Sequence, residues 1–547
     1  MLRQSERSLA DLARSMGALI FLVLATGCSP GSDGGNVTEG QSAGPDARAG
    51  AAEEAARRNP GVSTDRPTKE RGSGPPQLIL LLSLDTLRAD HLGMYGYERS
   101  TTPVLDKLAR EGVVFEDASS PTPWTLPAHA SLLTGLYPLS HGVTSMYAGL
   151  PRRISTLTDL LAKQGYDTAA VVNSEWLQKD THRLTKNFDK YLFVQPTTTR
   201  IAPSTWVTDQ AIEWLKGMGN ERLFLFVHYY DIHSDYASLP EFEKRFVTPY
   251  EGQANGTAWQ LQRAGLSEVH LKICSRGPDQ PSDKYDPAAL CNFGGNPKNF
   301  VIDHTTKKVH FDERDFQHLS ELYDAGVRQL DTELSRLFEF LDEAGILENT
   351  LIVVVSDHGE SLGEHGEVDH YLTVYQEVLR VPLIIRGPGI PKNTRVSTPV
   401  SLVDLVPTVA RIAQAPLPDS IDGIDLSPLW KGGSTGDFDR RLIHGEGAGG
   451  VNWSLAAPGL YPEHRSIRRA SHKLVYSSDG ERYKLFDLAK DPGEQHDMSA
   501  QEPEVFATLK SEMEQRYSSF DAQPTKETEV QLDQENIDRL RQLGYIH

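Results

Sequence analysis

Short runs of apolar residues alternate with amphipathic stretches through the middle of the chain. The first run, Leu78–Leu84, is continuously apolar except for one serine, which is typical of a strand buried on both faces. Between such runs, apolar residues recur at helical spacing from Leu319 to Leu341 and predict a long helix with one buried face. The alternation predicts an α/β fold in which helices cover both faces of a sheet. Further strands are predicted at 168–172, 223–227, 351–355 and 381–385.

Two segments depart from this alternation. Residues 237–318 lack clear periodicity, and we interpret them as an insertion over the functional edge of the sheet or as a surface loop without a role. After Pro407 the pattern changes to short strands at 473–476 and 483–488, followed by a helix near 503–517. The chain therefore predicts a small antiparallel C-terminal subdomain.

The N-terminus has the features of an export signal. Three arginines precede the apolar run Ala18–Ala25, which is short for a membrane span, and Ala25-Thr26-Gly27-Cys28 resembles a bacterial lipobox. We expect a lipoprotein anchored to the membrane through Cys28 and located in the cell envelope, with an uncleaved signal anchor as the alternative. The next residues are rich in Gly, Ser, Pro, Ala and charge, so they predict a disordered tether. The predicted organisation is a signal peptide at 1–27, a tether at 28–75, a catalytic α/β domain at 76–445 and the C-terminal subdomain at 446–547.

Composition narrows the function classes. The chain has 547 residues, 38% hydrophobic and 24% charged, which is typical of a globular protein. A formal net charge of −20 argues against nucleic acid or a polybasic membrane contact as partner. The two remaining cysteines, Cys274 and Cys291, are compatible with one disulfide in an exported protein and show no zinc spacing.

One hydroxyl group stands directly before a predicted helix. In Pro123-Trp124-Thr125-Leu126-Pro127, Pro127 suits the first helical turn and Thr125 is a favoured N-cap, and the helix is expected to end at Gly135. Such a hydroxyl faces unpaired backbone N–H groups, where anions bind. Taken alone, Thr125 is explained by ordinary capping.

Carboxylates at two strand ends change this interpretation. Asp85 follows the first strand, and Asp357 with His358 follows the strand at 351–355. In α/β sheets, ligands bind outside the carboxyl ends of the strands. Either aspartate alone could be a loop cap, but two oxygen ligands, an imidazole and the Thr125 hydroxyl together predict one divalent cation site, for Mg, Mn, Ca or Zn.

The phrase around Thr125 resembles the active-site signature of the sulfatase family in the alkaline phosphatase superfamily. There, Cys/Ser-x-Pro-x-Arg precedes Ala-Ser-Leu-Leu-Thr-Gly, and here Ala130–Gly135 matches the second part. The resemblance runs from about Leu78 to the C-terminus and implies a large mixed, mostly parallel sheet between helices. It also implies that Asp85, Thr125, Asp357 and His358 bind one metal. Thr125 replaces the modified Cys or Ser, His129 replaces the Arg, and Thr86 stands where many sulfatases have a second Asp.

Other candidate residues come from phrases near predicted strand ends. His233 and His370 resemble substrate-contacting positions of the family, and we assign both to catalysis, His233 as a possible proton donor to the leaving group. Substrate binding is assigned to three further residues, each with a structural alternative: His129 could hold the loop, His228 could be a core histidine, and Arg88 could pair with Asp90.

The differences from the sulfatase signature at Thr125 and His129 determine which activity we expect. Oxidation of Thr125 cannot give the aldehyde hydrate of formylglycine sulfatases, whereas a metal can activate a threonine hydroxyl as a nucleophile. We therefore expect a metal-dependent hydrolase or transferase that acts on a small-molecule, glycan or lipid phosphate ester through a covalent Thr125 intermediate. A sulfatase that does not use formylglycine and a non-catalytic binding lipoprotein are the alternatives.

Overall fold

The computed structural model describes residues 74–179, 181–195, 203–265, 309–370, 373–418, 420–433, 435–447 and 463–518, together with 529, 530 and 532. The expected signal peptide, most of the tether, Cys28, and the pair Cys274 and Cys291 lie outside these residues. Within the described part, no helix is both long and apolar enough to cross a membrane.

The core of the fold is a nine-stranded sheet with the order β10-β2-β9-β6-β1-β5-β3-β4, in which β11 also pairs with β2. All neighbours are parallel except β9, which runs antiparallel to both β2 and β6. The large mixed, mostly parallel sheet is therefore confirmed, and each strand predicted for this sheet falls within an observed one. The strands are β1 (Leu78–Leu84), β2 (Val113–Ser119), β3 (Tyr166–Val172), β4 (Lys190–Phe193), β5 (Arg222–Tyr229), β6 (Thr350–Val355), β9 (Arg380–Arg386), β10 (Thr394–Val396) and β11 (Val400–Ser401).

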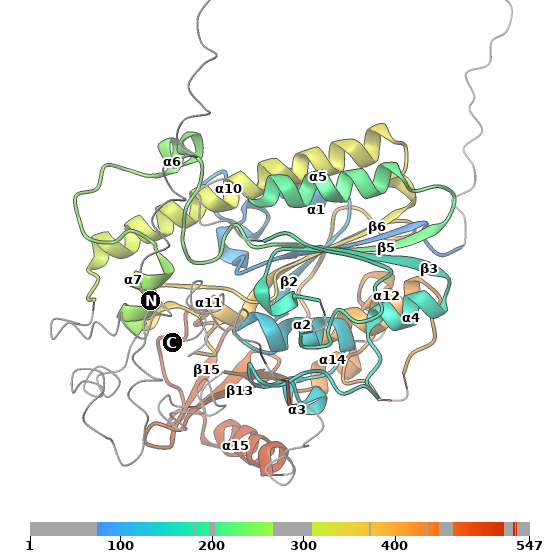
Figure 1. Cartoon of the computed structure of the whole chain (residues 1–547). Coiled ribbons are helices and arrows are strands. Elements are labelled where there is room, and N and C mark those ends of the chain that lie inside the picture. The colour runs from blue at the N-terminus through green and yellow to red at the C-terminus, as the bar shows by residue number, and fades with distance from the viewer. Residues whose placement is uncertain are drawn as a thin grey trace, which may run out of the picture. The chain divides into compact units, whose positions relative to one another are not determined.

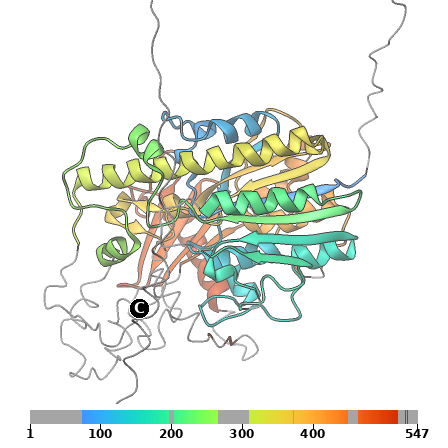
Figure 2. The same cartoon turned by 45° about the horizontal axis from the view of Figure 1, so that its top comes forward.

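Helices cover both faces of this sheet (Figure 1). On one face α1 (Pro103–Arg110), α5 (Pro203–Lys216) and α10 (Glu313–Glu343) pack on alternate strand residues such as Leu78, Leu80 and Leu225. On the other face α2 (Thr125–Thr134), α4 (Leu157–Lys163) and α12 (Leu405–Ile412) pack on Ile79, Leu81 and Phe226. Figure 2 shows α5 and α10 lying side by side across the sheet. The central strands β1 and β6 are buried at every position, and this explains why their sequences are nearly continuous apolar runs.

The helix predicted at 319–341 lies within α10, which begins earlier because Asp312 forms a capping box with Asp315. The described part of the predicted insertion contains α6 (Pro240–Phe246), α7 (Ala258–Gly265) and the start of α10. The other short helices are α3 (Pro138–His141), α11 (Gln376–Leu379), α13 (Ser427–Lys431), α14 (Gly436–Arg440), and the 3-10 turns η1 (Ala89–His91), η2 (Gly93–Tyr95), η3 (Glu175–Leu177), η5 (Leu347–Asn349), η6 (Glu364–Gly366) and η7 (Leu402–Asp404).

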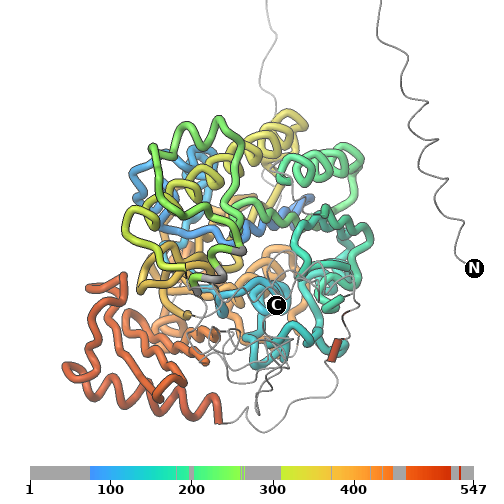
Figure 3. The backbone as a smooth tube through the Cα atoms, turned by 60° about the vertical axis from the view of Figure 1, so that its left-hand side comes forward, coloured from blue at the N-terminus to red at the C-terminus, as the bar shows by residue number. Residues whose placement is uncertain are grey.

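A second, antiparallel sheet has the strand order β12-β13-β14-β15 and is drawn in orange to red in Figure 3. Its strands are β12 (Ile443–Glu446), β13 (His464–Arg469), β14 (His472–Ser477) and β15 (Arg482–Asp487), and α15 (Pro503–Ser518) packs on one face. The small antiparallel subdomain with a helix is therefore confirmed. A short ladder of β7 (Ser361–Leu362) and β8 (Val368–Asp369) lies in the chain between β6 and α11.

Candidate active site

Strand order brings the predicted metal ligands together. β1 and β6 are parallel neighbours, so Asp85 after β1 and Asp357 after β6 meet at the same edge of the sheet. His358 Nε2 lies 3.7 Å from Asp85 Oδ1, 3.4 Å from Asp357 Oδ2 and 3.3 Å from the Thr125 hydroxyl. All four side chains are fully buried. The fold therefore brings together the four residues that the sequence predicted as metal ligands.

Thr125 occupies the first turn of α2, so the prediction that it is the N-cap of this helix is wrong. The extended residue before the helix is Trp124, which packs edge-on against Trp176. Pro127 is compatible with either start, because the first N–H groups of a helix have no partner within it. The shift places the Thr125 hydroxyl beside His358 Nε2, within the cluster of metal-ligand candidates.

The four residues fit a divalent cation. Neither Asp85 oxygen accepts a hydrogen bond of normal geometry from the described residues, nor does Asp357 Oδ2. His358 Nδ1 lies 2.9 Å from the Gly359 carbonyl oxygen, so the proton sits on Nδ1 and Nε2 keeps its lone pair. Neighbouring ligands on bonds of 2.0–2.2 Å would lie about 3.0 to 3.5 Å apart, close to the observed spacing.

The electrostatics of the two aspartates, Asp85 and Asp357, also favour a bound cation. Burial raises the pKa of Asp85 to about 7. Burial, and then the neighbouring charge of Asp85, raise the pKa of Asp357 well above its usual range. Oxygens of the two buried carboxylates lie within 4.8 Å of each other, so their negative charges repel unless positive charge lies between them. A bound divalent cation would supply that charge.

His129 ties α2 to β1. Its Nδ1 lies 2.8 Å from the Thr125 carbonyl oxygen, and its Nε2 lies 2.9 Å from the Ser83 hydroxyl. Nδ1 is also 3.5 Å from Asp357 Oδ2. These contacts match the loop-holding alternative, while contact with a substrate stays a prediction.

His233 and His370 lie beside this cluster. The His370 ring centroid is 4.5 Å from that of His358 and 4.7 Å from that of His233. His370 Nδ1 lies 3.0 Å from Glu360 Oε1 and 2.9 Å from Asp369 Oδ1. Burial opposes a charge on His370, but these two carboxylates outweigh it and raise its pKa to about 10. A cationic His370 therefore stands next to the metal-ligand cluster, where it can face an anionic group.

Arg88 is buried and engaged by carboxylates. Its guanidinium lies 2.7 Å from Asp90 and 2.8 Å from Glu364, and its Nη1 donates to the Glu360 carbonyl oxygen. The pair with Asp90 that the sequence left open is present. A role of Arg88 in substrate binding stays a prediction.

The loop that carries Asp357 and His358 is braced from α11. Gly359 N donates to the Val378 carbonyl oxygen at 2.7 Å, and Glu360 N donates to that of Glu377 at 3.1 Å. A Cβ atom on Gly359 would lie 2.1 Å from the Glu377 oxygen, so only glycine fits this approach.

Sequence reasoning missed the residues that surround its candidates. Glu360 and Asp369 flank His370, and Asn173 lies 3.1 Å from Nδ1 of His228. Tyr323 from α10 accepts a hydrogen bond from Arg88 N and donates one to the Thr86 carbonyl, which fixes the loop after β1. Of these residues, only Glu360 and Asp369 could have been predicted from the sequence, because both lie in short segments that contain candidate residues.

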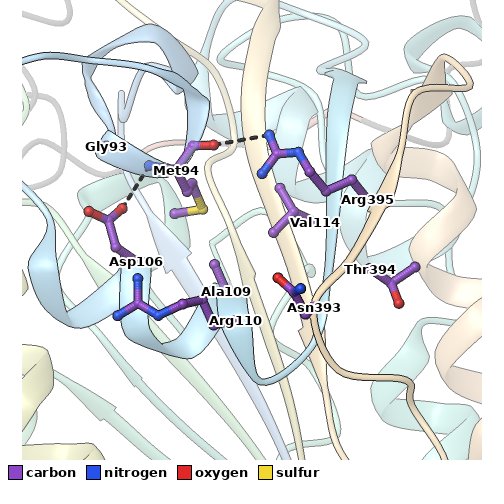
Figure 4. A pocket seen from close by; sticks show the side chains of 9 residues that line it. All are labelled: Gly93, Met94, Asp106, Ala109, Arg110, Val114, Asn393, Thr394 and Arg395. Atoms are coloured by element: carbon purple, nitrogen blue, oxygen red, sulfur yellow. Dashed lines mark hydrogen bonds between the residues drawn. The ribbon is translucent and has the colours of Figure 1, made fainter.

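A cavity of 240 Å³ lies elsewhere, between α1, β2 and the segment 393–395 (Figure 4). Its polar lining includes Asp106, Arg110 and Arg395, and Arg395 donates to the Met94 carbonyl. None of the candidate site residues lines this cavity.

The mixed sheet with this cluster at its carboxyl edge agrees with the hydrolase of the alkaline phosphatase superfamily that the sequence led us to expect. Comparison with known families specifies it further: residues 77–415 match the sulfatase model, and 363–521 match the model of the N-sulphoglucosamine sulphohydrolase C-terminal region. The chain belongs to the sulfatase family.

Known relatives support this assignment. An ulvan-active sulfatase of Formosa agariphila is 28% identical over 466 residues, which cover 82% of this chain and 80% of the relative. The solved structure of BT4656, in complex with its substrate D-glucosamine-2-N,6-O-disulfate, matches with a TM-score of 0.63 at 21% identity, covering 82% of this chain and 99% of that one. The phosphonate monoester hydrolase of Agrobacterium radiobacter matches with a TM-score of 0.60 at 21% identity, covering 84% and 100%. Because each of the two solved structures is 21% identical to this chain, they support the assignment of the fold and carry no conclusion about activity.

Proposed function

We propose that this sulfatase-family protein is a metal-dependent hydrolase or transferase of phosphate esters that uses Thr125 as its nucleophile. The observation that carries the proposal is the position of the Thr125 hydroxyl. It lies in the first turn of α2, 3.3 Å from His358 Nε2, within a fully buried cluster that also contains Asp85 and Asp357. A hydroxyl that served only as a helix cap would accept a backbone N–H, whereas the contact of the Thr125 hydroxyl is with the imidazole of His358.

Asp85, Thr125, Asp357 and His358 would hold one divalent cation. The cation would lower the pKa of the threonine hydroxyl and offset the negative charge of the transferring group. The Thr125 oxygen forms a bond to phosphorus, and the bond from phosphorus to the leaving alcohol breaks. The leaving oxygen takes a proton from the histidine pair His233 and His370, and the Thr125 proton passes to solvent. Water, or an acceptor alcohol in a transferase, then displaces Thr125.

Glu360 and Asp369 support this assignment of His370. Both carboxylates lie within 3.0 Å of its Nδ1, which directs the ring and maintains its positive charge. Charge aimed at the oxygens of a transferring group is a large contribution in such sites, because it is already oriented before the reaction begins.

Sulfate ester hydrolysis without formylglycine is the second candidate. Named relatives favour it, since the Formosa relative is an ulvan-active sulfatase and BT4656 binds a disulfated glucosamine. Against it, a threonine side chain oxidises to a ketone and cannot give the aldehyde hydrate. His129, at the position of the family's arginine, bonds to the protein itself. We propose a glycan, lipid or small-molecule ester as the substrate class. We also propose that the protein is located in the cell envelope, where a lipid anchor at Cys28 holds it.

Turnover of aryl phosphate monoesters, aryl phosphate diesters and aryl sulfates tests the proposal, with Mg²⁺, Mn²⁺, Ca²⁺ and Zn²⁺ supplied in turn. We expect phosphate ester turnover with at least one metal, a loss of 10³-fold or more in Thr125→Val, and a smaller loss in Thr125→Ser, which keeps the hydroxyl. Turnover of sulfates alone would favour the second candidate. Full activity in Thr125→Val would exclude Thr125 as the nucleophile.

A further inference from the structure

The β7–β8 hairpin connects residues of the candidate active site. Glu360 directly precedes β7, and Asp369 and His370 stand at the end of β8. The ladder pairs Ser361 with Asp369, so it brings the Glu360 and Asp369 carboxylates together on His370 Nδ1. A ladder of two residue pairs is too short to keep its geometry in water by itself. The position of His370 therefore depends on what holds this hairpin in place.

The strands and the turn of the hairpin are held in different ways. Leu362 and Val368 pack in the apolar core together with α10. The turn, residues 363–367, is held by polar side chains. Glu364 lies 2.8 Å from Arg88, the buried arginine after β1, and its Oε2 accepts the Leu362 N–H at 2.8 Å. Glu364 therefore joins the turn to the loop after β1, and the next residue joins it to two segments farther along the chain.

That next residue, His365, contacts α11 and the segment after β15. Its Nδ1 lies 2.9 Å from Glu377 Oε1, and its Nε2 lies 3.3 Å from the Glu494 carbonyl oxygen. Its ring stacks on that of Tyr375, with centroids 3.8 Å apart. The His365 side chain is 15% exposed. The backbone of His365 has a φ of 55°, a left-handed conformation that costs free energy and persists where surrounding contacts hold it.

Both ring nitrogens of His365 face oxygen atoms, so the doubly protonated ring fits this place best. It donates Nδ1–H to Glu377 and Nε2–H to the Glu494 carbonyl. When the ring is neutral with its proton on Nδ1, the Nε2 lone pair faces that carbonyl and can accept a hydrogen bond from Gln495 Nε2, 3.3 Å away. Hydrogen bonds of a charged group are about twice as strong as those of neutral groups, so deprotonation weakens the attachment of the turn.

The charges around the His365 ring also favour its protonated form. Burial opposes the charge, but the hydrogen bond and charge of Glu377, with a smaller contribution from Glu494, outweigh burial and raise the pKa of His365 above its usual value. The contact is therefore complete below about pH 6.5 and is lost as the pH rises through the folded-state pKa. The titratable groups near the ring are Glu364 and Glu367 on its own turn, Tyr375 and Glu377 at α11, and Glu494 with its partner Lys473.

We propose that His365 is a positioning residue: its charged ring fastens the turn of the β7–β8 hairpin to α11 and to the segment after β15, and the hairpin in turn sets the position of His370. The inference rests on the role of His370 in the proposed function and adds what holds that residue. α11 is a suitable anchor, because its carbonyl groups also accept the N–H groups of Gly359 and Glu360. The hairpin and the loop after β6 are thereby fixed to the same helix.

Hydrogen–deuterium exchange of the full chain between pH 6 and pH 10, corrected for the intrinsic pH dependence of exchange, tests the proposal in the peptide 361–369. In the wild type, we expect protection of this peptide to fall by about 10-fold as the pH rises through one midpoint. Glu377→Gln keeps a hydrogen-bond acceptor but removes the charge, so the midpoint should fall by about one pH unit or more. His365→Arg stays charged throughout this range and should abolish the transition.

Phosphate ester turnover at pH 7 measures the effect on His370. His365→Phe keeps a ring against Tyr375 but removes both polar contacts, so we expect kcat to fall by about 10-fold and KM to change less. His365→Arg should restore most of the lost kcat. His496→Gln is the matched control, because His496 also follows β15 but is 84% exposed. This control should match the wild type in exchange and in turnover.

The outcomes separate this inference from the proposed function. A wild-type chain that turns over no phosphate ester with any of the four metals contradicts the proposed function, and the exchange measurement still decides the role of His365. Exchange without a pH transition, or a midpoint that Glu377→Gln leaves in place, overturns the positioning role, as does an unchanged kcat in His365→Phe. If His365→Phe fails to fold, the midpoint shift in Glu377→Gln carries the test.

Discussion

A buried ion pair joins the C-terminal sheet to the loops around the site, and breaking it should destabilise the protein strongly. Lys473 of β14 lies 2.8 Å from Glu494, with side-chain exposures of 2% and 0%. Lys473 Nζ also donates to the Val374 carbonyl oxygen, and Gln376 N donates to Glu494 Oε2. Glu494 belongs to the phrase Asp491-Pro492-Gly493-Glu494. The pair therefore anchors α11, which in turn braces the loop that carries Asp357 and His358.

The magnitude for Lys473→Met follows from this geometry. Two unit charges 2.8 Å apart attract each other by about 6 kcal/mol at an effective dielectric constant of 20. Methionine avoids the cost of burying the ammonium group, which offsets part of that loss. Measured costs of breaking one side of a buried pair are about 3–5 kcal/mol, and we expect Lys473→Met to fall in this range. The double variant Lys473→Met with Glu494→Gln should recover most of the loss, because no buried charge then remains.

The loss should also depend on pH. Burial raises the pKa of Glu494, and removal of the ammonium group raises it further. A carboxyl group whose pKa is higher in the folded than in the unfolded state loses stability as the pH rises above its unfolded value, about 4.3. Lys473→Met should therefore be nearly tolerated at pH 5 and most destabilising at pH 8.

Urea unfolding at pH 5 and pH 8, followed by both tryptophan fluorescence and circular dichroism, measures these differences. Lys490→Met is the matched control, because Lys490 is 72% exposed and pairs with Asp487 at 2.7 Å in the same subdomain. An exposed pair contributes little to stability, because water screens its charges. If Lys473→Met costs no more at pH 8 than this control, the stabilising role of the buried pair is refuted.

Two further predictions concern the loops at the site. Gly359→Ala should cost about 1–3 kcal/mol or more and weaken metal binding, because its Cβ would overlap the Glu377 carbonyl oxygen; calorimetric unfolding and Mn²⁺ titration check this, with Gly217→Ala as a control in an uncrowded position. Arg88→Met should lower the free energy of unfolding by about 1–3 kcal/mol, measured by urea unfolding; the loss is smaller than for a fully buried pair because Asp90 and Glu364 are 51% and 38% exposed and water can solvate them. A variant that folds normally but has a raised KM would instead support Arg88 as a substrate-binding residue.

The sequence alone was sufficient for the elements and for the chemistry of the ligands. A strand buried on both faces is apolar at most positions, so β1, β5 and β6 are visible as nearly continuous apolar runs. Long helices such as α10 are equally visible, because one face packs on the sheet at every turn. Asp85, Asp357 and His358 stand out because a polar residue directly after such a run must lie at the carboxyl edge.

Tertiary structure decided what lies next to what. Local periodicity carries no record of strand order, so the antiparallel direction of β9 and the adjacency of β1, β5 and β3 depend on contacts between distant segments. The same holds for single side chains: His129 bonds to Ser83, and Lys473 of β14 pairs with Glu494, which follows β15. The sequence by itself determined that Thr125, two aspartates and a histidine would stand at strand and helix ends. Only the packed sheet brought them within hydrogen-bonding or ion-pair distance, because parallel strands superimpose their carboxyl ends whatever their separation along the chain.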